Sequence, residues 1–288
     1  MTSPKKLLYA RNLKPKKSLG QNFLIDPKTA ERIIERSTIK PEDTVLEIGA
    51  GLGALTIPAA RRAKKVVAIE NDKHMCDLLK TELQLNHISN VHIIHENILK
   101  TDIAEVCDTS DQCIVIANLP YYISSQVLVK LIRERRIIRK AVLMFQKEMA
   151  ERIASKPGCK NYGRLAVMTQ YCADIKKILD LKAALFYPKP NIDSRVIEVR
   201  FKTNIDYPAD DETLLFKVIK GAFSKRRKIL KNSLSGNELH MNPQTAEMIL
   251  KKAGIDPLRR AETLNIKEFV KLSNIVLQFN NPADTLSS

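Results

Sequence analysis

The tetrapeptide that begins at Asn118 carries residue types suited to chemistry on a flat, amino-bearing ring. It follows the apolar run Ile114–Ala117, which predicts a fully buried strand. Pro120 stops the chain from continuing as strand or helix and holds Leu119 extended. The corner therefore offers two acceptors, the Asn118 side-chain oxygen and the Leu119 carbonyl, beside the ring of Tyr121. Two acceptors and a stacking surface fit the exocyclic amino group of a planar base.

The tetrapeptide alone is weak evidence, because a strand that merely ends in a turn gives the same four residues. A second motif lies nearer the N-terminus, where Gly49, Gly51 and Gly53 alternate directly after the strand predicted at 44–48. Glycine permits positive φ and has no side chain, so a ligand can approach the backbone of such a turn. Glu70 ends the next predicted strand about 20 residues later, the offset at which an acidic residue meets ribose hydroxyls.

The spacing of the glycines bears on the ligand. A dinucleotide site has the pattern G-x-G-x-x-G, whose last glycine packs the helix on the strand. Here the pattern is G-x-G-x-G, and Glu47 precedes it. That pattern looks like the first motif of S-adenosylmethionine-dependent methyltransferases, so we expect S-adenosylmethionine as the cofactor. A nicotinamide dehydrogenase is the alternative, disfavoured by this spacing and by the lack of a placed proton-transfer residue.

Strands and helices that must position these residues alternate along the chain. Asp26 and Pro27 predict a helix start, with an N-cap and a proline in the first turn. Apolar runs predict strands at 44–48, 65–69, 91–94, 114–117 and 141–145. This alternation indicates an α/β fold, a Rossmann-like doubly wound methyltransferase sheet of parallel strands. Ligands gather outside the carboxyl ends of such strands, where Gly49, Glu70, Asn97 and Asn118 all fall.

Composition and periodicity divide the chain into three parts. We expect a basic N-terminal tail at 1–19, the methyltransferase domain at 20–204 and a smaller all-helical, RNA-binding domain at 205–288. The boundary follows a strand predicted at 195–201, where a polar stretch contains Pro208.

In the helical part an apolar stripe meets a run of basic residues. Either Arg227 snorkels beside the stripe, or the helix breaks near Gly221 and Ser224. A basic run is often only a solvated face. On a chain this positive we expect an RNA contact from Lys225, Arg226, Arg227 and Lys228.

The bulk properties point to a polyanionic partner. The formal net charge is +16 and the pI is about 9.6, which favours nucleic acid or an acidic membrane surface. No apolar run approaches the ~20 residues of a membrane span, and we see no signal peptide, so nucleic acid is favoured. The five cysteines are scattered without a C-x-x-C pair, which indicates reduced thiols, a cytoplasmic protein and no metal site.

Taken together, the motifs resemble the ribosomal RNA small-subunit adenine N6,N6-dimethyltransferases, and the resemblance runs nearly end to end. Their order and spacing are specific, although no single motif is diagnostic. The segments that carry it are Leu19–Leu24, Glu47–Gly53, Glu70, Asn118–Tyr121, Phe186–Pro190 and Ala222–Lys228.

The resemblance implies a role for residues around the donor. Asn22 and Leu24 would close over it, Gly49 and Gly51 would lie against its methionine part, and Glu70 would bind its ribose.

One position departs from the family. An aspartate usually follows the third strand and contacts the donor adenine, whereas this chain has Asn97 there with Glu96 beside it. An amide accepts that hydrogen bond without charge. Asn118 would serve both donor and substrate.

The catalytic residues that the resemblance implies are Asn118, Leu119, Pro120, Tyr121 and Phe186. The two acceptors of the corner would hold the adenine amino group, while Tyr121 and Phe186 would cover the two faces of the base. The implied reaction places two methyl groups on each of two adjacent adenosines. These lie in a hairpin near the 3′ end of small-subunit (16S) RNA, in immature 30S particles during ribosome biogenesis. We expect a monomer that needs neither metal nor membrane.

Two rivals remain beside the dehydrogenase. A methylase of the same chemistry could act on large-subunit RNA. A non-catalytic RNA-binding or assembly factor could keep the fold without turnover; Gly49, Glu70, Asn118 and Tyr121 argue against it, and Asn97 argues faintly for it.

Overall fold

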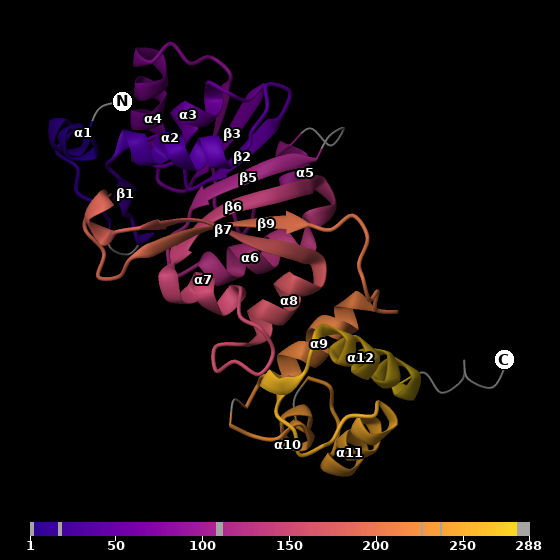
Figure 1. The fold of residues 1–288 in the computed structure, drawn as a ribbon. Helices are drawn as coiled ribbons and strands as arrows, with labels where there is room; N and C mark the ends of the chain where they lie inside the picture. Colours follow the sequence, from indigo (N-terminus) through magenta and orange to yellow (C-terminus); the bar gives the residue numbers. More distant parts are fainter. Residues whose placement is uncertain (1–2, 17–18, 108–111, 226, 237, 281–288) are drawn as a thin grey trace. The chain divides into compact units, whose positions relative to one another are not determined.

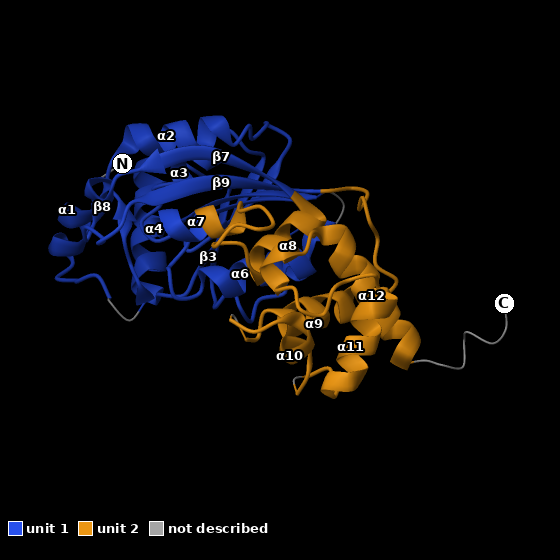
Figure 2. Cartoon of the chain, turned by 60° about the horizontal axis from the view of Figure 1, so that its bottom comes forward, with its two compact units in different colours: residues 1–150, 174–201 blue, residues 151–173, 202–288 orange. Residues whose placement is uncertain are grey.

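The computed structural model describes residues 3–16, 19–107, 112–225, 227–236 and 238–280. The chain forms two compact units, shown in Figure 2. Unit 1 comprises Met1–Ala150 and Asp174–Phe201, and unit 2 comprises Glu151–Ala173 and Lys202–Ser288. The chain finally enters unit 2 close to the boundary expected after residue 204. Residues 151–173, which the sequence placed in the first domain, also belong to unit 2.

Unit 1 is built on a seven-stranded sheet with the order β4-β3-β2-β5-β6-β9-β7 (Figure 1). Each neighbouring pair from β4 to β6 is parallel, and β9 is antiparallel to β6. The sheet is therefore mixed but mostly parallel, with the doubly wound core that the alternation predicted. The strands are β2 (Thr44–Ile48), β3 (Lys65–Glu70), β4 (Val91–His95), β5 (Cys113–Asn118), β6 (Ile138–Gln146), β7 (Ala173–Leu181) and β9 (Ser194–Phe201).

Helices cover both faces of the sheet because its central strands are apolar on both sides. Helices α2 and α3 lie on one side and α6 on the other (Figures 1 and 2). Asp26 caps α2 as expected, its carboxylate accepting a hydrogen bond from the Thr29 amide at 2.9 Å. The helices of unit 1 are α1 (Pro4–Ala10), α2 (Pro27–Arg36), α3 (Thr56–Ala60), α4 (Lys73–Leu85), α5 (Ile103–Val106) and α6 (Ser124–Arg133); α7 (Lys147–Ile153) runs from unit 1 into unit 2.

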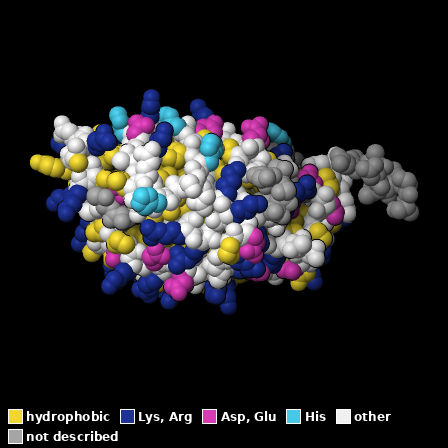
Figure 3. Space-filling model, turned by 90° about the horizontal axis from the view of Figure 1, so that it is seen from above, with side chains coloured by type: hydrophobic (Ala, Val, Ile, Leu, Met, Phe, Trp, Pro, Cys, Tyr) yellow, Lys and Arg dark blue, Asp and Glu magenta, His cyan; other side chains and the backbone are white. Residues whose placement is uncertain are grey.

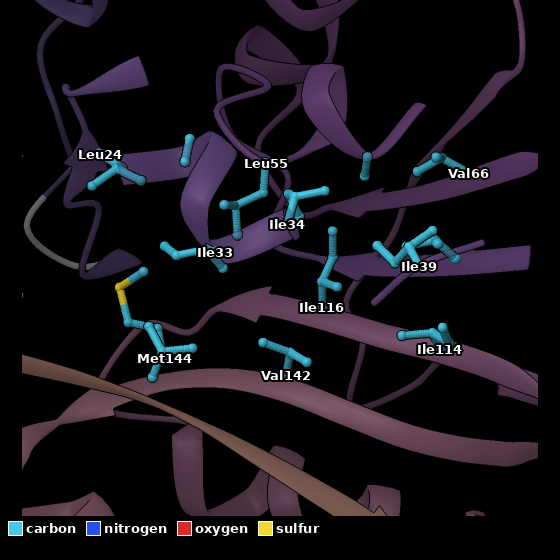
Figure 4. Packing of buried hydrophobic residues seen from close by; sticks show 14 of the residues in the cluster. Leu24, Ile33, Ile34, Ile39, Leu55, Val66, Ile114, Ile116, Val142 and Met144 are labelled. Carbon is cyan, nitrogen blue, oxygen red and sulfur yellow. The ribbon is translucent and has the colours of Figure 1, made fainter. Parts of the chain in front are cut away.

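Figure 4 shows the packing beneath α2. Ile33 and Ile34 of the helix belong to one buried cluster with Ile114 and Ile116 of β5, and all four are at most 1 % exposed. The level of β5 in the sheet, and so the level at which its last residue leaves the core, is given by its pairing with β2 and β6.

The first residues are not the basic tail that the sequence suggested. Pro4–Ala10 form helix α1, whose Leu8 is 2 % exposed and packs in a cluster with Leu52, Met75 and Leu78. The charge of the segment hid this apolar anchor, and several of its partners, such as Leu52 and Met75, lie 44 or more residues away in sequence.

A small two-stranded sheet was also not predicted. β1 (Phe23–Leu24) pairs antiparallel with β8 (Phe186–Tyr187), so that Leu24 lies opposite Phe186. It ties the N-terminal segment to the loop between β7 and β9.

Unit 2 is helical in its described residues. Its helices are α8 (Arg164–Cys172), α9 (Glu212–Ala222), α10 (Leu230–Leu234), α11 (Pro243–Lys252) and α12 (Ile266–Asn280). Phe223, directly after α9, stacks on Phe269 at 5.9 Å between ring centroids. The helix therefore breaks near Gly221 and Ser224, and Arg227 lies exposed in the turn that follows.

We predict that Leu8→Ala lowers the free energy of unfolding by ~2–5 kcal/mol, because it leaves a cavity under α1. Urea unfolding of the purified protein measures this. The neighbouring Tyr9 is 87 % exposed, and Tyr9→Ala serves as the control, expected within ~0.5 kcal/mol of the parent. Equal stability of the two variants would show that α1 does not dock.

Candidate functional site

A cavity of about 370 Å³ opens in unit 1 at the carboxyl ends of the central strands. In the parallel registers Ile48 lies opposite both Ile69 and Ala117, so β2, β3 and β5 end at one level. The volume of the cavity lies in the usual range for small-molecule sites. The residues expected at the site that line the cavity are Asn22, Leu24, Gly49, Gly51, Glu70, Glu96, Asn97, Asn118, Leu119, Pro120 and Tyr121.

The glycine turn forms the floor of the cavity. Gly49 has φ +73°, and its amide donates to the Ile69 carbonyl at 2.8 Å. A Cβ there would meet only the Asn118 carbonyl oxygen, at 3.9 Å, and would otherwise extend into the space that a ligand can use. At Gly53 a Cβ would lie 2.7 Å from the Leu79 side chain, so this glycine serves the packing of α4. The first glycine therefore faces the ligand space and the third does not.

Glu70 is held rigidly at the end of β3. One carboxylate oxygen accepts from the Gly51 amide at 2.8 Å and the other from the Asp72 amide at 2.9 Å. The side chain is almost fully buried, and burial raises the pKa of Glu70 although these hydrogen bonds oppose the shift. Each oxygen keeps a further lone pair, so the carboxylate can still accept from a pair of hydroxyl groups.

Asn97 and Glu96 shape the wall beyond β4. The Asn97 side-chain oxygen accepts from the Leu99 amide at 3.0 Å, and its backbone carbonyl accepts from the Lys100 amide at 2.7 Å. Glu96 accepts from the hydroxyl of Thr101 at 2.9 Å. The amide at position 97 therefore makes the local turn that a carboxylate would also make.

The corner after β5 is fixed by one long-range hydrogen bond. The Asn118 side-chain nitrogen donates to the Asn22 backbone carbonyl at 2.9 Å. Because the nitrogen is directed at that carbonyl, the side-chain oxygen is the acceptor that Asn118 can offer a ligand. Leu119 is 2 % exposed and lines the cavity beside it. Both residues that the sequence predicted to supply the acceptors therefore line the cavity.

Two hydrogen bonds to serines orient Tyr121. Its hydroxyl lies 3.2 Å from the hydroxyl of Ser194, which is fully buried at the start of β9. Its carbonyl accepts from the Ser124 hydroxyl at 2.9 Å, at the start of α6. The side chain is therefore held at its hydroxyl and the backbone at its carbonyl.

Phe186 requires a correction, because the structure does not bring it to the cavity. It is 3 % exposed and packs in the core cluster with Leu24, Met144 and Val196. Strand alternation explains this: in the short β8 its side chain points into the core. We keep base stacking for Tyr121 and withdraw it for Phe186.

The basic run lies in unit 2, in the turn between α9 and α10. The Lys225 ammonium donates to the carbonyls of Asn232 and Ser235, at 3.1 and 3.4 Å. Lys225 thus stabilises the turn, while Arg227 and Lys228 are exposed. Arg226 lies outside the described residues.

Sequence reasoning missed the partners of the N-terminal loop. The side-chain nitrogen of Gln21 donates to Asp72 at 3.0 Å, a contact that the sequence did not predict. Tyr122 was not singled out either; it lines the cavity, is 55 % exposed and lies against Gly20. The one sequence feature that could have indicated Asp72 is its position between a strand and a helix, which is typical of an N-cap.

Glu47, which precedes the glycines, is the most deeply buried acid at the site. It is 2 % exposed, and one of its carboxyl oxygens has no hydrogen-bond partner among the described residues. Burial raises the pKa of Glu47 to about 8, and the charge of Glu70 adds to the shift. Near neutral pH this carboxyl is therefore largely protonated.

Two absences hold for the residues that the structure describes. They contain no group of three or more His, Cys, Asp and Glu arranged to hold a metal ion. None of the described helices has the length and apolar character needed to cross a bilayer.

Comparison with known proteins gives concordant results. The family model for ribosomal RNA adenine dimethylase matches residues 12–277. The chain is similar to proteins named ribosomal RNA small subunit methyltransferase A. One, from Desulforapulum autotrophicum, is 52 % identical over 95 % of this chain and 96 % of its own length. Another, from Geobacillus kaustophilus, is 43 % identical over 94 % of each.

Solved structures agree in fold. A dimethyladenosine transferase from Plasmodium falciparum is 28 % identical with a TM-score of 0.73, covering 90 % of this chain and 98 % of its own. The 23S rRNA methyltransferase ErmE has a TM-score of 0.64 over 89 % of this chain and 100 % of its own. At 24 % identity that second likeness concerns the fold alone.

We predict that Glu47→Gln changes how stability depends on pH. In the parent the unfolded chain releases this proton near the ordinary value of 4.5, whereas the folded chain keeps it until pH 8 or so. Stability of the parent therefore falls as pH rises between these values. The variant does not titrate there, so its melting temperature relative to the parent should rise between pH 5 and 8. Glu42→Gln, at an exposed position, is the control, and parallel melting curves for parent and Glu47→Gln would contradict the assignment.

Proposed function

The chain belongs to the ribosomal RNA adenine dimethylase family, and from that premise we propose how it acts and on what. It is an S-adenosylmethionine-dependent rRNA adenine dimethyltransferase. Its proposed substrate is a hairpin near the 3′ end of small-subunit (16S) RNA. There it would place two methyl groups on the N6 nitrogen of each of two adjacent adenosines. One observation carries this: Asn118 and Leu119 line the same cavity as Gly49 and Glu70.

The residues present fit the donor. Gly49, which has open space in front of it, and Gly51, which also lines the cavity, would hold its methionine part. The carboxylate of Glu70, held by backbone amides, would accept from its ribose hydroxyls. Asn22 and Leu24 would close over it from the N-terminal side. When bound, S-adenosylmethionine supplies a methyl group on a positively charged sulfur.

Asn97 and Glu96 would line the adenine end. The Asn97 oxygen already accepts one amide hydrogen and has a second lone pair for the adenine amino group. Since a neutral acceptor makes a weaker bond than a carboxylate, we infer that this chain holds the adenine less tightly than a relative with aspartate.

The chemistry would be electrostatic. An adenine amino nitrogen is a poor nucleophile because its lone pair is delocalised into the ring. The Asn118 oxygen and the Leu119 carbonyl, accepting its two hydrogens, would favour a pyramidal nitrogen and stabilise the positive charge that develops on it. Pro120 would keep that carbonyl in place, and alignment of nitrogen with the methyl group would supply the remainder. We assign no general base, because the product releases its proton to water.

Tyr121 would stack on the target adenine, an interaction worth ~1–3 kcal/mol. Its contacts with Ser194 and Ser124 hold the ring in place before the base arrives. The base must leave its hairpin to reach this cavity, as in other base-modifying enzymes.

RNA binding would rest on charge. The net charge is +16, and Figure 3 shows Lys and Arg side chains spread over the face that it draws. In unit 2 the exposed Arg227 and Lys228 are the members of the basic run that we assign to phosphates. The substrate would be the immature 30S particle, where shape and phosphate contacts outweigh base sequence. Because the cavity is complete within unit 1 of one chain, we propose a monomer, working in the cytoplasm where subunits assemble.

Methyl transfer with mapped product sites tests the proposal. Labelled S-adenosylmethionine is incubated with immature small subunits, and methylated adenosines are mapped in both ribosomal RNAs. Label confined to adjacent adenosines of the small-subunit hairpin supports it. Label in the large-subunit RNA would redirect the substrate, and binding without label would indicate an assembly factor.

We predict that Asn118→Ala lowers kcat by about 10²–10³-fold, the effect of removing one preorganised group that stabilises developing charge. Tyr121→Ala should come close to that loss. Asn86→Ala is the control, because Asn86 ends α4 and contacts Glu82 rather than the cavity. Methylation at the parental rate by Asn118→Ala would refute the mechanism.

We predict that the double variant Arg227→Ala, Lys228→Ala weakens binding to immature subunits and reduces the slope of log K against log salt by about 1–2. Donor affinity, measured by calorimetry, should not change. Lys225→Ala should instead lower the melting temperature, since its ammonium bonds to two backbone carbonyls. An unchanged salt slope would remove Arg227 and Lys228 from the interface.

A further inference from the structure

A polar network joins the end of β3 to the N-terminal segment. One oxygen of Asp72 accepts from Lys16 at 2.9 Å and from Gln21 at 3.0 Å. The other accepts from the amide of His74 at 3.2 Å, as the N-cap of α4. The backbone amide of Asp72 donates to the carboxylate of Glu70. Asp72 therefore contacts both the proposed donor-binding carboxylate and the segment above it.

This arrangement exceeds what an N-cap needs. Capping uses one oxygen, and a side chain 2 % exposed to solvent would ordinarily be disfavoured as a charge. Burial would raise the pKa of Asp72, but the bonds from Lys16 and Gln21 outweigh it and lower the pKa. Lys16 is itself joined to Gln21, its backbone amide donating to the Gln21 side-chain oxygen at 2.8 Å. The three residues form a closed set.

The network is connected to Asn118 through the residue that follows Gln21. Asn22 follows Gln21, and its carbonyl accepts the bond that orients Asn118. Without that carbonyl, the Asn118 amide could turn about its last bond and present nitrogen instead of oxygen. A donor amide at this place would face the hydrogens of an adenine amino group. The bond that holds Gln21 therefore affects which end of the Asn118 amide, oxygen or nitrogen, faces the ligand.

We propose that Asp72 is a positioning residue for methyl transfer, holding Gln21 and so the Asn22 carbonyl that orients Asn118. Residues 19–24, which we call the N-terminal strap, also line the cavity, so the same anchor holds the strap over the bound donor. This inference rests on the function proposed above.

The test uses Asp72→Ser and Gln21→Ala in the full-length chain. Serine keeps an N-cap oxygen for α4 but is too short to reach Gln21 and Lys16. Gln21→Ala removes the same link from the other side and leaves the cap intact. Each should lower kcat roughly tenfold, the loss of one hydrogen bond to a charged group, and raise KM for S-adenosylmethionine severalfold. The double variant should be no worse than the more impaired single variant, because both remove one link.

A second readout separates positioning from stability. Amide hydrogen exchange in the strap should speed up in both variants while exchange in β2 stays at the parental rate. Asp102→Ser is the matched control: Asp102 caps α5 through the amide of Ala104 and should lose neither activity nor protection in the strap. Gln21→Ala keeps the test decisive if Asp72→Ser fails to fold.

The outcomes distinguish this inference from the proposed function. If the parent neither binds S-adenosylmethionine nor methylates subunits, the proposed function fails. If the parent is active and Gln21→Ala matches it in kcat and exchange, the positioning role is overturned. Losses that simply add in the double variant would also overturn it, because Asp72 and Gln21 would then act separately.

Discussion

The hydrogen bond from the Asn118 side chain to the Asn22 carbonyl is the contact on which the proposed chemistry depends. An asparagine amide has a donating and an accepting end, and only the accepting end can receive the hydrogens of an amino group. The bond selects that end before substrate arrives. It spans 96 residues of sequence, so the orientation of a single amide rests on how the N-terminal segment lies against the sheet.

The cavity also places two buried acids close to the glycine turn, with different hydrogen-bond partners. Glu70 has both oxygens engaged by backbone amides and remains able to accept from hydroxyl groups. Glu47 is buried with one oxygen unpartnered among the described residues, so burial favours its neutral form. Burial raises the pKa of both carboxyls, but at Glu70 the bonds from backbone amides oppose that shift.

In the proposed function the two units would have different tasks on a large RNA substrate. Residues of unit 1 line the cavity, so this unit would hold both donor and base. Unit 2 presents exposed basic residues from the turn between α9 and α10, while Lys225 of the same run stabilises that turn. Adjacent positions in one basic motif thus have different tasks, which charge alone does not distinguish.

Local chemistry in the sequence determined the elements and the edge of the sheet at which the site lies. Buried apolar runs specify strands, Asp26 and Pro27 start a helix, and parallel strands bring Gly49, Glu70 and Asn118 to one edge whatever the loops do. Only the tertiary structure decided the rest. The side chain of Phe186 points into the core because β8 pairs with β1. Leu8 packs a lysine-rich N-terminal segment against the sheet domain, although its charge suggested a tail. Asp72 bonds to Gln21, 51 residues away in sequence. Such contacts join short segments far apart in the chain, where neither periodicity nor spacing records the partner.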